Sequence, residues 1–337
     1  MESSADPAIV YAPARDGLSL PVIDLTNPQF AVPDDKASFE ALQTRYLDEH
    51  RRMQNAFKFV TRLLMRLAAR RSLLMRALVH SDSGFLDSIT TYIMKLGERH
   101  LPAGFDGSID RKIAASPYAP LLRLRMQQIA KLCAHALVAP LRANAAAPLH
   151  LVNIAGGPAL DSINTLMFLR RDHKELLQRP ICIHVLDAQD DGPAFGANVL
   201  AALKRDGAPL HGLDADFRYQ AYDWTQTQTL QRLLKGLAAG GAVIAASSEG
   251  GLFEYGDDES IVANLAALGE AGVNIVAGSV TGSSELRKQT IADSKFRLIP
   301  RGLEGFEPLA RRAGYAIATS ATALISEQVL LRLAEKT

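Results

Sequence analysis

The residues best suited to chemistry are two adjacent glycines and a series of acids that each end an apolar run. Gly156 and Gly157 follow the run Leu149–Ala155 and precede a helical pattern. Glycines allow a tight turn and close backbone approach, and the free N–H groups that open a helix can hold an anionic group. Asp187 ends the next apolar run, Ile181–Leu186, where a carboxylate can accept both hydroxyls of a ribose. This order indicates a nucleoside-type site.

A further acid follows the third apolar run. Asp223 and Trp224 come directly after Phe217–Tyr222, so a carboxylate is available for an adenine amino group and the only tryptophan for its flat face. Each acid alone reads as an N-cap or a loop residue. Together they place a nucleoside at the carboxyl ends of adjacent strands, which is where open α/β sheets bind ligands.

The elements that must position these residues begin after Pro148. Short apolar runs end in Gly, Ser or Asp and alternate with helical patterns, which predicts βαβ units around a buried parallel sheet. The fold class is therefore α/β, a Rossmann-like doubly wound sheet of seven strands. The last two runs have no helix between them and must pair antiparallel. The expected strands are Leu149–Ala155, Ile181–Leu186, Phe217–Tyr222, Ala242–Ser247, Val273–Ser279, Tyr315–Thr322 and Gln328–Leu333.

The chain before this sheet has a different texture. Five prolines in residues 1–37 predict an extended arm. Residues 38–147 carry apolar side chains at helical spacing, with Ser38 as a candidate N-cap. This helical region is expected to cover the carboxyl edge of the sheet and to choose the substrate, and residues 148–337 form the nucleoside-binding domain. Basic residues between Arg51 and Arg76 are interpreted as the solvated side of a helix, because no aromatics are interleaved to stack nucleic acid bases.

Composition and short motifs limit the classes of partner and of active site that the protein is expected to have. The formal net charge is +1, which provides no global field for nucleic acid or an anionic membrane. The two cysteines, Cys133 and Cys182, are far apart, so we expect a reducing, cytoplasmic setting. From the sequence we expect neither a secretory signal nor a membrane span. The eight histidines have no HxxxH or HxH spacing, and no metal site is predicted. Hydrolase and kinase motifs are also missing.

The ordered motifs from about residue 120 to the end resemble those of the class I S-adenosylmethionine-dependent methyltransferases. The segment Asn153–Asp161 is similar to the first motif of that family, an acid followed by three alternate glycines. Asn153 stands at the acid position, Ala155 at the first glycine and Ala159 at the third. The resemblance implies S-adenosylmethionine as cofactor, with Asp187 on its ribose. The residues implied to bind the cofactor are Arg123, Ala155, Gly156, Gly157, Asp187, Asp223, Trp224 and Glu249.

A narrower resemblance is to the leucine carboxyl methyltransferase-like branch. In that branch the fourth strand runs into Ser-Glu-Gly and a helix, as Ala242–Tyr255 does here. The resemblance implies that Glu249 contacts the amino acid end of the cofactor. It also implies an arginine on the helix before the first strand, for which Arg123 is the first choice and Arg125 the second. An arginine suits this place because its fork presents parallel donors to a carboxylate.

The resemblance implies a methyltransferase that acts on a small molecule, more at oxygen than at nitrogen or carbon. No catalytic base is assigned, because a carboxylate acceptor needs no deprotonation. The partner expected is a small-molecule methyl acceptor, and the sequence leaves a homodimer open. Two alternatives remain. One is a non-catalytic binding or assembly protein with a degenerate fold, motivated by Asn153, Ala155 and Ala159. The other is an NAD(P)-dependent oxidoreductase, although Ala155–Leu160 supplies the G-x-G-x-x-G spacing poorly.

Overall fold

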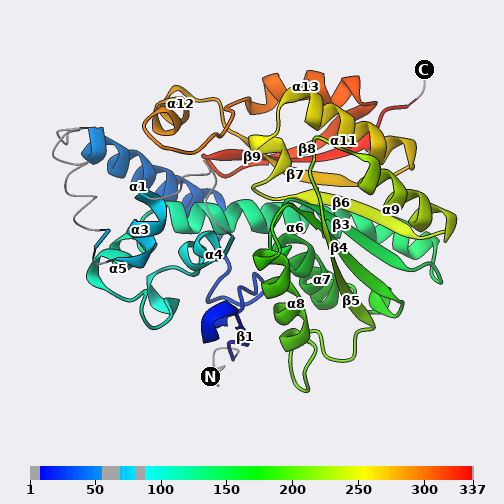
Figure 1. Cartoon of the computed structure of the whole chain (residues 1–337), viewed down its shortest axis with the longest axis horizontal. Helices are drawn as coiled ribbons and strands as arrows, with labels where there is room; N and C mark the ends of the chain where they lie inside the picture. The colour runs from blue at the N-terminus through cyan, green and yellow to red at the C-terminus, as the bar shows by residue number, and fades with distance from the viewer. Residues whose placement is uncertain (1–7, 55–68, 71, 80–87, 336–337) are drawn as a thin grey trace.

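A seven-stranded mixed sheet forms the centre of the molecule (Figure 1). The computed structural model describes residues 8–54, 69, 70, 72–79 and 88–335. The sheet order is β5-β4-β3-β6-β7-β9-β8. Its strands are β3 (Leu149–Ile154), β4 (Ile181–Asp187), β5 (Ala215–Ala221), β6 (Val243–Ser248), β7 (Val276–Thr281), β8 (Tyr315–Thr322) and β9 (Ser326–Leu333).

The strand order confirms the predicted fold class. Numbered along the chain, the strands lie in the order 3-2-1-4-5-7-6, and the first five are parallel. The last strand, β9, is antiparallel to both β7 and β8. The dinucleotide-binding order is 3-2-1-4-5-6, so this sheet differs from it by one antiparallel strand inserted beside β7. The parallel strands end at one edge, called here the carboxyl edge.

Helices cover both faces of the sheet because its strands are apolar on both sides. One buried cluster joins the sheet to α6, α7 and α8, and the other joins it to α9, α11 and α13. The described helices of this part are α6 (Tyr118–Ala143), α7 (Leu160–Asp172), α8 (Asp191–Leu203), α9 (Gln228–Ala239), α10 (Leu252–Tyr255), α11 (Asp258–Glu270), α12 (Glu285–Ala292) and α13 (Gly302–Arg312), with a short 3-10 turn at Lys174–Leu177.

The helices that precede α6 in the chain lie at one end of the sheet (Figure 1). They are α1 (Lys36–Gln54), α3 (Leu73–Val79), α4 (Ser88–Leu96) and α5 (Ser108–Ala114), with a 3-10 turn at Glu98–His100. The first begins two residues before Ser38, and the Asp35 carboxylate accepts from the Ser38 N–H at 3.1 Å. Asp35 therefore has the capping role predicted for Ser38. Part of the expected helical and basic stretch, residues 55–68 and 71, lies outside the described residues.

The first described residues contact the core. β1 (Tyr11–Pro13) and β2 (Ser19–Pro21) form a small antiparallel sheet, separated by a 3-10 turn at Arg15–Gly17. Leu20, Ile23 and Phe30 are buried in the same cluster as α7 and α8. Burial of each such side chain contributes roughly 1.5–3 kcal/mol, so this segment is held by hydrophobic packing.

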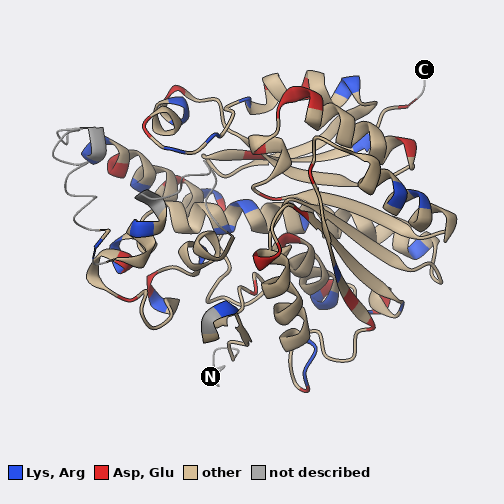
Figure 2. Ribbon diagram, in the orientation of Figure 1, with Lys and Arg blue, Asp and Glu red and all other residues tan. Residues whose placement is uncertain are grey.

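Charged residues are distributed mainly over the helices and loops, whereas the central strands carry few (Figure 2). Among the described helices, none combines the length and hydrophobicity that crossing a membrane requires.

Candidate functional site

The turn between β3 and α7 has an unusual backbone. Ala155, Gly157 and Ala159 have φ values of 55°, 57° and 51°. This left-handed region favours glycine, and it costs roughly 1–2 kcal/mol for a residue with a Cβ. These three positions are the ones at which the family motif has its glycines. The backbone thus keeps the conformation of a glycine-rich turn although two of the three residues are alanines.

Asp187 lies against this turn, as the sequence predicts. Its Oδ2 accepts from the N–H of Gly157 and its Oδ1 from the N–H of Gln189, both at 3.0 Å. Burial raises the pKa of Asp187, opposed by these backbone hydrogen bonds. Each carboxylate oxygen can accept two hydrogen bonds, so each retains one lone pair for a ligand hydroxyl.

Two helices approach the same turn. A Cβ built on Gly157 would come within 2.7 Å of the Ser88 Oγ at the start of α4. A Cβ built on Gly192, in the first turn of α8, would come within 2.8 Å of both the Gly157 Cα and the Ser88 Oγ. The glycines therefore permit close packing between elements as well as the turn itself. Ser88 was not predicted as part of this site.

Asp223 and Trp224 follow the end of β5. In the sheet, β5 pairs with β4, the strand that ends at Asp187. Asp223 is exposed, and its Oδ1 accepts from the backbone N–H and the hydroxyl of Thr225 at 2.9 and 2.8 Å. These hydrogen bonds lower the pKa of Asp223. Trp224 is partly buried against the α9–α11 side, and its carbonyl accepts from Asn264 at 2.7 Å. Asn264 thus holds the backbone of this loop through the Trp224 carbonyl, and the Asp223 carboxylate faces solvent.

Glu249 belongs to a buried network of four charged side chains. Its Oε2 accepts from the Lys95 ammonium at 2.6 Å, and its Oε1 from the Nε of Arg125 at 2.6 Å. The opposite side of the Arg125 guanidinium donates to both oxygens of Glu254, at 3.0 and 3.2 Å. All four side chains are at most 7% exposed. Although burial opposes ionisation, Arg125 and Lys95 hold the pKa of Glu249 at about 2.

Within this network the arginine is Arg125, the second of the two candidates. Arg123, the first choice, donates instead to the Lys95 carbonyl at 2.7 Å. Burial lowers the pKa of Arg123 to about 10. The structure also provides the reason for Gly250: its φ is 71°, and a Cβ there would lie 2.7 Å from the Arg125 guanidinium. Lys95 and Glu254 were not predicted, because no local motif marks them.

Another buried acid, Asp161, lies under the glycine turn. Asn153 is fully buried, and its amide donates to the Asp161 Oδ1 at 2.8 Å and accepts from the Gly156 N–H at 3.0 Å. Asp161 is 1% exposed, and its Oδ2 has no hydrogen-bond partner in the described part of the chain. Burial raises the pKa of Asp161 to about 6. The carboxylate absent from position 153 is thus supplied from α7.

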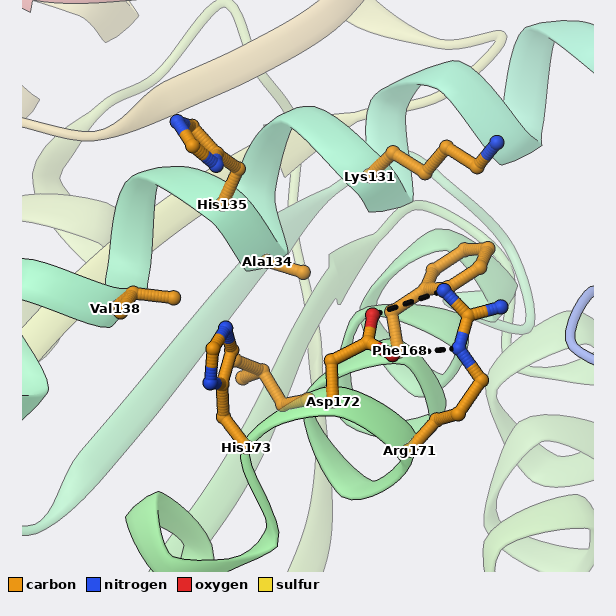
Figure 3. A pocket seen from close by; sticks show the side chains of 9 residues that line it. Lys131, Ala134, His135, Val138, Phe168, Arg171, Asp172 and His173 are labelled. Carbon is orange, nitrogen blue, oxygen red and sulfur yellow. Dashed lines mark hydrogen bonds and ion pairs between the residues drawn. The ribbon is translucent and has the colours of Figure 1, made fainter.

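Two hollows in the described part of the chain lie away from the carboxyl edge. One, of about 250 Å³, lies between α6 and α7 (Figure 3). There Lys131 and Arg171 approach the Phe168 ring, at 5.9 and 5.1 Å from its centroid, and Arg171 is paired with Asp172. The other, of about 430 Å³, lies between α8 and β5. Neither contains the acids of the predicted site.

No protein-family model matches the chain, and no curated protein matches it. Several solved structures match part of the chain. An O-methyltransferase from neocarzinostatin biosynthesis, in complex with S-adenosyl-L-homocysteine and 1,4-dihydroxy-2-naphthoic acid, is 18% identical, with a TM-score of 0.37 over 55% of this chain and 49% of that one. Mitomycin 7-O-methyltransferase is 13% identical, with a TM-score of 0.40 over 67% and 58%. Human N-acetylserotonin methyltransferase with S-adenosylmethionine is 11% identical, with a TM-score of 0.37 over 64% and 56%.

The matched part of this chain therefore spans about half to three fifths of the length of these three structures. The fold assignment itself depends on the strand order and on the antiparallel β9. The resemblance to the leucine carboxyl methyltransferase-like branch stays a prediction. At the level of the fold, the chain is an α/β protein with a Rossmann-like seven-stranded sheet and an antiparallel last strand, as the resemblance to the class I methyltransferases implies.

Proposed function

We propose that the protein is an S-adenosylmethionine-dependent methyltransferase that methylates a small molecule at oxygen. The observation that carries this proposal is the contact between Gly157 and Asp187 within a turn whose three motif positions all have positive φ. A turn that only linked β3 to α7 would not require the strained backbone of Ala155 and Ala159. Such strain is found where surrounding structure holds a functional conformation.

The nucleoside half of the cofactor fits the residues present. The remaining lone pairs of Asp187 are available to ribose hydroxyls, as its hydrogen bonds to Gly157 and Gln189 use only one per oxygen. The exposed Asp223 carboxylate is available to an adenine amino group, beside Trp224. Bound S-adenosylmethionine would supply a methyl group on a positively charged sulfur. The protein would then need to align the acceptor oxygen and exclude water, and no side chain is assigned as a base.

A second candidate is a binding or assembly protein that retains the fold without transferring methyl groups. Its support is the pairing of Glu249 with Lys95 and Arg125. The resemblance assigns Glu249 and an arginine to the amino acid end of the cofactor, but the Arg125 guanidinium already donates to both Glu249 and Glu254. A ligand that used these groups would have to displace internal partners.

Calorimetric titration with S-adenosylmethionine, S-adenosylhomocysteine and NADH separates these readings. We expect micromolar binding of the first two and none of NADH. Asp187→Asn should weaken both by at least about tenfold, because hydrogen bonds to a charged group contribute about 1.5–3 kcal/mol. Asp48→Asn is the matched control, since Asp48 is an exposed acid on α1. Binding of none of the three ligands would favour the second candidate, and unchanged affinity in Asp187→Asn would overturn the site.

A further inference from the structure

Two histidines and a cysteine gather on the sheet face that α9 covers. The Nδ1 of His150, on β3, lies 2.9 Å from the Nε2 of His184, on β4. Together with the Cys182 thiol, these ring nitrogens form a group whose ligand atoms all lie within 4.8 Å of one another. Cys182 and His184 are buried, whereas His150 is partly exposed. The cluster is therefore reachable from solvent at one side only.

Strand register explains why these three side chains meet. His150 pairs with Cys182, and Val152 pairs with His184. Paired residues of neighbouring parallel strands face the same side, and residues two apart on one strand share a face. Val152 belongs to the cluster packed against α9, so all three polar side chains project to that side. On β3 and β4 they stand next to the apolar Val152, Ile154 and Leu186, which share this face.

We propose that His150, Cys182 and His184 bind a divalent transition-metal ion, with Zn²⁺ as the best match. Two imidazoles and a thiolate are ligands that zinc binds in tetrahedral sites, with Zn–N distances near 2.0–2.1 Å. Such distances require the two ring nitrogens to lie about 3.3 Å apart. They are now 2.9 Å apart and hydrogen-bonded to each other, so binding requires a small separation of the two rings and a rotation that turns both lone pairs toward the metal. The His–His hydrogen bond would be exchanged for two metal bonds.

A fourth ligand would have to come from outside the group of three residues. Asp216, on β5, pairs in register with Cys182 and so shares its face. Its side chain is 66% exposed and lies 3.5 Å from Arg218, an exposed contact that is worth little. A water molecule can complete a tetrahedral site, whereas the Asp216 carboxylate would first have to turn from Arg218 toward the cluster.

The chemical state of the ligands is compatible with metal uptake. The hydrogen bond between the His150 Nδ1 and the His184 Nε2 requires one of these nitrogens to accept, so at least one ring already presents a lone pair within the cluster. The Cys182 thiol is not part of a disulfide. Binding forms the metal–sulfur bond as the S–H bond breaks, and one proton leaves to solvent.

This metal site is distinct from the carboxyl edge. His184 precedes Asp187 by three residues, or about 10 Å along an extended strand, and His150 precedes Ala155 by five. A metal here would link β3 to β4, the two strands that carry the glycine turn and Asp187. Its expected effect is stabilisation of this pair rather than participation in chemistry.

Cobalt binding tests the proposal directly. The tag-free protein, freed of metals by chelator, is titrated with Co²⁺ and followed by absorption. We expect one equivalent to produce the visible bands of tetrahedral cobalt and a near-ultraviolet sulfur-to-cobalt band, both removed by Zn²⁺. Cys182→Ser should abolish the sulfur band and weaken binding by about 100-fold or more. Cys133→Ser is the matched control, because Cys133 is the other buried free thiol.

His150→Gln provides a second variant, since His150 is partly exposed and its loss should leave the fold intact, which circular dichroism checks. It should keep the sulfur band but lower the affinity and the rise in unfolding temperature caused by Zn²⁺. Failure of the wild-type protein to bind either Co²⁺ or Zn²⁺ at metal concentrations up to about 100 µM would overturn the proposal. Equal spectra from the wild type and Cys182→Ser would do the same.

Discussion

Replacing Asp161 by asparagine tests the electrostatics beneath the glycine turn. Asp161 is 1% exposed, and burial raises its pKa from 3.8 to about 6, although the Ser247 hydroxyl opposes the change. Its Oδ1 accepts from Asn153, whereas its Oδ2 has no partner among the described residues. The asparagine of the variant can keep the first hydrogen bond through its amide oxygen, and it carries no charge to desolvate.

The sign and size of the effect of Asp161 on the free energy of unfolding follow from its pKa values in the folded and unfolded chain. Above pH 6 the carboxyl is ionised in both the folded and the unfolded chain, and the raised pKa of Asp161 costs the folded state about 3 kcal/mol, at 1.36 kcal/mol per pKa unit. Below pH 3.8 it is protonated in both states, and this cost is absent. Between these limits the folded state binds more protons, so the contribution of Asp161 to stability rises as the pH falls. Asp161→Asn should remove this dependence.

The measurement is urea unfolding of the wild type and Asp161→Asn at pH 4, 6 and 8. The free energy of unfolding of the variant, minus that of the wild type, should increase by about 2.5 kcal/mol from pH 4 to pH 8, because pH 4 still lies slightly above the unfolded pKa of 3.8. A new amide without an acceptor costs about 1–3 kcal/mol at every pH, so it shifts the curve without changing its shape. Asp48→Asn, exposed on α1, should give a flat difference. A flat difference for Asp161→Asn would refute the reasoning.

Two further predictions concern the turn and the charge network. Ala155→Gly should raise the urea midpoint, with a gain of up to about 1 kcal/mol in the free energy of unfolding, since it relieves a positive φ. Gly157→Ala should lower it, because its Cβ would lie 2.7 Å from Ser88; equal loss in both variants would contradict the strain argument. Glu249→Gln should cost about 3–5 kcal/mol at pH 7, because two buried cations lose their shared anion. With a folded pKa of about 2 and an ordinary value of 4.5, the stability that Glu249 contributes is present above pH 4.5 and lost toward pH 2. The cost of the variant should therefore shrink in acid unfolding experiments, and a cost that stays constant would argue against an ionised Glu249.

The sheet could be predicted from the sequence because its signals are local. The strand Tyr315–Thr322 has the predicted bounds, and the antiparallel pairing with β9 follows from the short connection. The fifth strand begins at Val276 rather than at Val273. Val273 is buried all the same, so its hydrophobicity reflects packing and not strand pairing. Hydrophobic runs therefore locate a strand better than they locate its first residue.

The site was only partly predictable, because some of its contacts join distant segments. The Gly157–Asp187 contact follows from the βα pattern, but Lys95 and Glu249 are 154 positions apart. Arg123 and Arg125 point to nearly opposite sides of their helix, at about 100° per residue. Choosing between them requires knowing which side of α6 faces the sheet. The group of His150, Cys182 and His184 was not predicted either, because His150 lies on a different strand from the other two and no local motif joins them.

The methyltransferase proposal and its alternative, a binding or assembly protein, both depend on α4. Its first residue, Ser88, packs over Gly157, and its Lys95 donates to Glu249. The same short helix therefore contacts the predicted cofactor turn at one end and the predicted amino acid subsite at the other. A cofactor that reached both places would have to exchange the Lys95–Glu249 pair for its own ammonium, a trade of one buried cation for another. The amino acid end of S-adenosylmethionine also carries a carboxylate, which the displaced Lys95 ammonium would need as its new partner, and the net free energy of this exchange depends on how far α4 must move.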